Sequence, residues 1–106
     1  QLVSIRVRLT DAAKDDVRAI LTWIEQRSPA GAEAWYGAWM DALRTLGERA
    51  EALAEAPESD DHAEPVRQLL FKTKRGRRYR ALFVVRGDAA FVLHVRGPGQ
   101  DTLRWD

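Results

Sequence analysis

The sequence predicts an α+β domain with the element order β-α-α-β-β-β, in which an N-terminal helical hairpin packs on an antiparallel sheet. Helical apolar spacing and strand-like alternation occupy different parts of the chain, which is typical of helices gathered on one face of a sheet. Alternation covers residues 3–9, helical spacing covers 11–26 and 29–54, and alternation returns at about 66–73, 78–86 and 89–96. With 106 residues, 45% apolar and 31% charged, the chain fits a single globular domain spanning residues 1–106.

The first strand and the two helices have clear local signals. Apolar residues alternate with polar ones at Val3, Ile5, Val7 and Leu9, which predicts a strand with one buried face. Thr10 can cap a helix that has Asp11 in its first turn. Ser28-Pro29 is a second start signal, with Pro at the first helical position. Because only a residue or two separates the helices, we expect them to fold back as an antiparallel hairpin.

The second half of the chain predicts a loop and three strands. Residues 55–65 are acidic and bracketed by proline, which indicates a loop, and Gly87-Asp88 predicts a tight two-residue turn between the last two strands. We expect Leu82 and Val84 to share one strand face. One apolar layer between hairpin and sheet should contain Val17, Ile20, Leu21, Ile24, Leu43, Leu46, Leu82, Val84, Val92 and Val95.

Charge is segregated along the chain. Residues 66–106 hold ten Lys/Arg and three Asp/Glu, a net of +7, whereas residues 1–65 hold seven and thirteen, a net of −6. Such a separation is informative about binding partners, and it predicts an anionic target or an acidic protein partner. Because Trp is favoured at interface hot spots, one of the hairpin tryptophans could also anchor a partner. The predicted partner-binding residues are Arg75, Arg77, Arg78, Arg80, Arg86, Arg96, Trp35 and Trp39.

Composition excludes several kinds of site. The chain has no cysteine, which rules out disulfides, thiol catalysis and cysteine-ligated zinc. His62 and His94 lie too far apart in sequence to suggest a metal site, and we expect no metal or cofactor. No apolar run approaches the roughly 20 residues of a membrane span, and the first residues lack the apolar block of a secretory signal. We therefore expect a cytoplasmic protein without membrane contact.

Motifs along essentially the whole chain match one family in order. They are Leu9-Thr10-Asp11-Ala12-Ala13-Lys14-Asp15-Asp16 leading to Ile20-Leu21-Thr22-Trp23-Ile24, then Ser28-Pro29 through Trp39, Arg78-Tyr79-Arg80-Ala81-Leu82-Phe83, Gly87-Asp88, and Val92-Leu93-His94-Val95-Arg96. This ordered set resembles the RelE/ParE superfamily of bacterial toxins from type II toxin–antitoxin modules. One departure is that Arg96-Gly97-Pro98-Gly99 stands where many relatives have Arg-His-Gly.

The resemblance favours the ParE-like branch. RNA-cleaving relatives usually carry a Tyr or His near the C-terminus, and this chain has no Tyr after Tyr79 and no His after His94. By resemblance, the chain is expected to inhibit DNA gyrase without being an enzyme. It is also expected to be neutralised in a hetero-oligomer with an antitoxin that has an acidic, partly disordered C-terminal segment.

Two alternatives stay open. The first is a ribosome-dependent mRNA endoribonuclease of the RelE branch, with Lys72, Lys74, Arg80 and Arg96 as phosphate-binding catalytic residues. The second is a non-toxic binding module that has lost activity through the Gly97-Pro98-Gly99 replacement. His94 lies within a predicted strand, and we interpret it as a packed or hydrogen-bonded structural residue in preference to a catalytic one.

Overall fold

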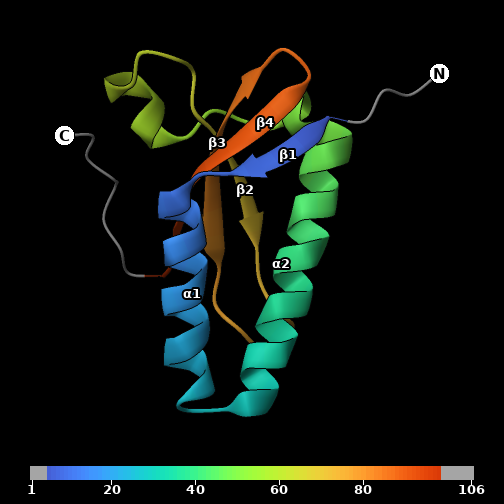
Figure 1. Cartoon of the computed structure of the whole chain (residues 1–106), viewed down its shortest axis with the longest axis vertical. Coiled ribbons are helices and arrows are strands. Elements are labelled where there is room, and N and C mark those ends of the chain that lie inside the picture. The colour runs from blue at the N-terminus through green and yellow to red at the C-terminus, as the bar shows by residue number, and fades with distance from the viewer. Residues whose placement is uncertain (1–4, 99–106) are drawn as a thin grey trace.

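The computed structural model describes residues 5–98 and has the predicted element order. Its main elements are β1 (Arg6–Leu9), α1 (Asp11–Glu25), α2 (Pro29–Arg49), β2 (Arg67–Phe71), β3 (Tyr79–Arg86) and β4 (Ala89–Arg96). Two short 3-10 helices, η1 (Ala50–Ala52) and η2 (Pro57–Asp61), lie between α2 and β2. Figure 1 shows the hairpin of α1 and α2, with β2 and β3 running behind and between the two helices.

The predicted helix starts are confirmed. Thr10 Oγ1 accepts the Ala13 N–H at 3.1 Å, and Ser28 Oγ accepts the Gly31 N–H at 2.9 Å, so each side chain satisfies a donor that the first turn leaves unpaired. The second helix ends at Arg49, earlier than expected, and η1 continues the chain to Ala52.

The sheet has the order β1-β4-β3-β2. Both β2–β3 and β3–β4 are antiparallel, but β1 pairs with β4 in parallel, so the sheet is mixed and not wholly antiparallel. The last two strands are joined by the expected two residues, and Gly87 has φ of +60°, as the first position of a type II′ hairpin turn requires. Val3 of the first predicted strand lies outside the described residues.

A β-bulge in β4 decides which side chains face the helices. Leu82 pairs with His94 and Phe83 pairs with Val92, so Leu93 is an extra residue in the ladder. Because of this extra residue, Val92 and Val95 both reach the helix side of the sheet although they are three positions apart.

The helix-side core centres on aromatic residues. Trp35 and Trp39 stack with centroids 6.0 Å apart and contact Phe71, while Leu46 and Phe83 are fully buried. By contrast, the predicted core residues of α1 and one of α2 are only partly buried at its margin: Val17, Ile20, Leu21, Ile24 and Leu43.

A second core on the opposite side of the sheet corrects one prediction. Leu82 and Val84 do share a strand face and are fully buried, but they pack with Ala56 and Val66 and not against the helical hairpin. The segment predicted as a simple loop therefore covers the back of the sheet, and it brings Glu58 into that second layer.

Candidate binding site

A buried ion pair joins the acidic segment to the sheet. Glu58 is 1% exposed, and its two carboxylate oxygens accept hydrogen bonds from Arg80 at 2.9 and 2.7 Å. Gln68, on the neighbouring strand β2, accepts a third hydrogen bond from the same guanidinium at 3.0 Å. Hydrogen bonding to the Glu58 carboxylate raises the pKa of Arg80 above its ordinary value, against the opposing effect of burial. Arg80 is thus neutralised within its own chain.

Arg86 is also paired with the acidic segment. Its Nε donates to Glu64 Oε2 at 2.8 Å, and its Nη2 donates to the other oxygen of the same carboxylate. This bidentate contact lowers the pKa of Glu64 and raises that of Arg86. The Arg86 side chain is 54% exposed, so the pair is open to solvent and screened by salt.

These contacts revise the predicted binding surface. Arg80 and Arg86 were expected to face an external partner, but both have carboxylate partners between residues 57 and 64 of the same chain. In each pair the arginine and the glutamate are 22 positions apart in sequence and meet only in the folded chain. The remaining predicted cations divide into Arg96, half-buried at the end of β4, and a group in the loop after β2.

The loop of residues 72–78 carries five exposed cations. Among residues 5–98, no ion pair involves Lys72, Lys74, Arg75, Arg77 or Arg78. Gly76 donates its N–H to the Thr73 carbonyl, and a Cβ at Gly76 would lie 2.2 Å from Thr73 Oγ1, so only glycine fits this tight turn without rearrangement.

An open groove of about 780 Å³ lies beside this loop. Its apolar lining comes from α1, from Trp35 of α2, from the start of β3 and from the residues after β4. It includes Ile20, Trp23, Ile24, Tyr79 and Pro98. Arg75 and Arg77 also line it, which places positive charge beside an apolar surface. The groove explains why α1 has only one fully buried residue, since part of its apolar stripe faces this open space.

The tryptophans divide differently from the prediction. Trp35 and Trp39 were expected to contact a partner, but each is 2% exposed and belongs to the core, although Trp35 also borders the groove. Of the three tryptophans in the helical hairpin, Trp23 is exposed, with 55% of its surface accessible and the Arg27 guanidinium 3.8 Å from its ring centroid. Trp23 follows Ile20 at helical spacing, three positions later, and this was the sequence signal that could have placed it on the groove-lining face of α1.

The four residues of the RNA-cleaving alternative do not form one set of available cations. Arg80 and Arg96 face each other across β3 and β4, but Arg80 is bound to Glu58, and Lys72 and Lys74 are exposed in the loop after β2. Burial raises the pKa of Tyr79 above its usual range.

His94 has the structural role expected from its place in a strand. Its Nδ1 lies 3.0 Å from Asp16 Oδ2, and the same oxygen accepts the Val95 N–H at 2.9 Å. Thr10 Oγ1 donates to the Leu93 carbonyl nearby. These contacts attach the first half of α1 to the part of β4 that extends beyond β1.

Comparisons with known proteins give a fold assignment. No protein-family model matches the sequence, and no curated protein is significantly similar to it. In the part of the chain that the structure describes, neither long helix has the apolar character of a membrane span. A solved chain from the "Chromosomal ParDE TA system from P. aeruginosa" is similar in structure, with a TM-score of 0.64 and 22% sequence identity over 88% of this chain and 95% of that one. The chain therefore shares its fold with a chain of a ParDE toxin–antitoxin system.

Proposed function

We propose that this chain is the toxin of a ParE-like type II toxin–antitoxin module and that direct binding of an acidic antitoxin holds it inactive. The observation that carries this proposal is the structural similarity to a ParDE chain over 88% of the present chain, combined with an apolar groove lined in part by arginines. The resemblance in the sequence motifs supports the same assignment independently of the structure comparison.

The groove suits one kind of partner segment. Apolar side chains of an amphipathic segment can pack between Ile20, Ile24 and Tyr79, while its carboxylates meet Arg75 and Arg77. A segment with few apolar residues and high negative charge is disordered alone and folds on binding, which is the behaviour expected of the antitoxin C-terminal region. The toxin and the antitoxin then form a hetero-oligomer in the cytoplasm.

The proposed target is DNA gyrase, and the proposed action is not enzymatic. One feature of residues 5–98 supports this over mRNA cleavage: Arg80 is occupied by Glu58. Gly97 and Pro98 also lack side chains suited to proton transfer.

Unopposed expression of the chain should arrest growth, and co-expression of the neighbouring antitoxin gene should relieve the arrest. Gyrase-dependent DNA breaks are expected while cellular mRNA stays intact by primer extension. Growth arrest by the Arg75→Glu/Arg77→Glu variant should be relieved less well by the antitoxin, because reversed charge beside the groove repels acidic side chains.

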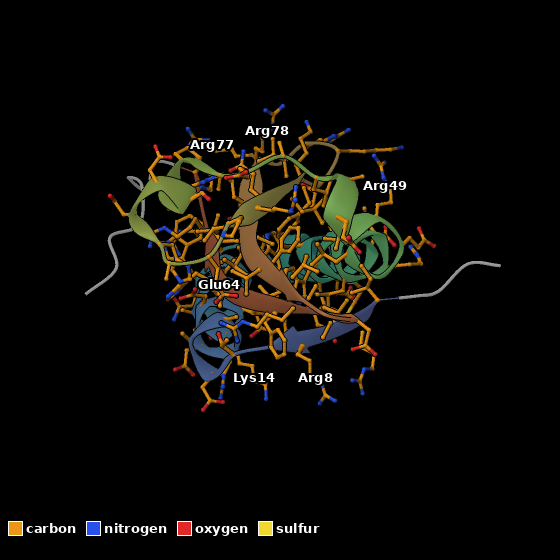
Figure 2. All side chains as sticks on the ribbon, turned by 90° about the horizontal axis from the view of Figure 1, so that it is seen from above. Arg8, Lys14, Arg49, Glu64, Arg77 and Arg78 are labelled. Carbon is orange, nitrogen blue, oxygen red and sulfur yellow. The ribbon has the colours of Figure 1, made fainter. Side chains whose placement is uncertain are left out.

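A matched control reverses Arg8 and Lys14, which lie on another side of the molecule (Figure 2). The antitoxin should relieve growth arrest by the Arg8→Glu/Lys14→Glu variant as well as it relieves arrest by the parent chain. Codon-associated mRNA cuts would contradict the proposed target, and normal growth at confirmed expression would contradict toxicity itself. Equal relief of both variants would exclude the arginines beside the groove from antitoxin binding. If charge reversal abolishes toxicity, relief of growth arrest can no longer be measured. The affinity of the purified variants for the antitoxin is then compared instead.

A further inference from the structure

The loop between β2 and β3 combines high charge with an absence of apolar side chains. Residues 72–78 read Lys-Thr-Lys-Arg-Gly-Arg-Arg, and no acidic residue occurs between Glu64 and Asp88. All five cations are exposed. The tight turn at Thr73–Gly76 places Lys74 and Arg75 at the end of the loop.

The other residues that the structure describes leave this charge without an ion-pair partner. The acidic segment neutralises Arg80 and Arg86, the cations of β3, through Glu58 and Glu64. Within residues 5–98, no carboxylate forms an ion pair with the five cations of the loop. Closely spaced exposed cations repel one another, so a polyanion that binds them relieves this repulsion.

We propose that the loop of residues 72–78 binds the phosphate backbone of duplex DNA without sequence preference. Stable protein partners rely on buried aromatic or aliphatic anchors, and this loop contributes none between Lys72 and Arg78. Phosphate backbones, in contrast, are bound mainly by Lys and Arg through charge and counterion release. A loop with five cations in seven residues and no apolar side chain therefore fits a duplex backbone better than it fits an acidic protein.

The surrounding aromatic residues favour duplex over single-stranded nucleic acid. Proteins that bind single strands stack bases on available aromatic rings. Next to the loop, Tyr79 packs against Phe71 and Trp35, and the Arg27 guanidinium lies over the ring of Trp23. Tyr79 thus has ring partners inside the chain, and Trp23, although 55% exposed, carries the Arg27 guanidinium over its ring. A duplex, in contrast, presents phosphates without requiring a stacking platform.

The loop and the proposed antitoxin groove share only some of their residues. Arg75 and Arg77 line the groove, but Lys72, Lys74 and Arg78 are not among its lining residues. Figure 2 shows Arg78 and Arg77 on the same side as Arg49 of α2, and Arg8 and Lys14 on the opposite side. Exposed cations on the two sides can therefore be compared directly.

The test measures binding of the full chain to a fluorescent random-sequence DNA duplex by anisotropy between 50 and 200 mM salt. The variant Lys74→Gln/Arg78→Gln removes one lysine and one arginine outside the groove, and the control Arg8→Gln/Lys14→Gln removes the same charge elsewhere. Each phosphate that a variant no longer neutralises should reduce the slope of log affinity against log salt by about 0.9, so the slope should fall by about 1.8 for the loop variant and stay unchanged for the control. Circular dichroism confirms that both variants are folded.

Three outcomes would overturn the inference. One is an equal effect of the loop and control variants, which would indicate binding through net charge alone. Another is tighter binding to a single-stranded oligonucleotide of the same length than to the duplex. The third is binding of poly-glutamate that equals duplex binding, which would assign the loop to acidic proteins. None of these outcomes bears on growth arrest or on gyrase, so this inference can fail while the proposed function stands.

Discussion

Replacing Glu58 with Gln should destabilise the protein by about 3–5 kcal/mol, because it leaves the charge of Arg80 largely buried without its partner. The Glu58 carboxylate is fully buried, the Arg80 side chain is 22% exposed, and two hydrogen bonds of 2.7 and 2.9 Å join them. A domain of this size has a total stability of roughly 0.05–0.15 kcal/mol per residue, so the loss is a large fraction of it. Urea unfolding followed by circular dichroism measures the change.

Two controls make this prediction specific. Glu64→Gln removes the carboxylate of the exposed pair with Arg86 and should shift the unfolding midpoint much less. The double variant Glu58→Gln/Arg80→Gln should be more stable than Glu58→Gln alone, since no unpaired charge remains in it. An unchanged midpoint for Glu58→Gln would show that the ion pair does not hold η2 on the sheet.

Leu46→Ala should cost about 2–5 kcal/mol of unfolding free energy, because Leu46 is 0% exposed in the helix-side core. Truncation removes buried apolar contacts and leaves a cavity under α2. Val17→Ala is the comparison, since Val17 lies at the partly exposed margin on α1, and it should cost clearly less. Equal effects of the two substitutions in urea unfolding would contradict the placement of the core under α2.

Local features of this fold were predictable from the sequence. The caps at Thr10 and Ser28 and the turn at Gly87-Asp88 depend on residues close together in the chain, and all three are present. The parallel pairing of β1 with β4 was not predicted, because pairing of distant strands depends on how the whole sheet assembles.

The sequence pattern did not determine what covers each side of the sheet. Parity correctly placed Leu82 and Val84 on one face, but parity does not say which face the helices cover. The acidic composition of residues 55–65 indicated a solvated loop, whereas Ala56 and Val66 are buried and carry Glu58 onto the sheet. Apolar residues inside a charged segment were the available signal.

The candidate site was predicted in part. The cations of residues 72–78 are exposed, and Arg75 and Arg77 line a groove, but Lys72 and Arg78 lie in a loop and not in the predicted strands. Which cations are neutralised inside the chain could not be read from the sequence, because Arg80 and Glu58 lie 22 positions apart and meet only after the acidic segment folds over the sheet. The groove itself depends on how far α1 stands from the start of β3, which periodicity does not determine.

The most direct test of the proposed function uses purified chain, DNA gyrase and supercoiled plasmid with ATP. We predict inhibited supercoiling and linear plasmid after denaturation of the enzyme, both prevented by prior addition of the antitoxin. Unimpaired gyrase at a molar excess of folded chain, together with cleavage of mRNA in a translating extract, would contradict it.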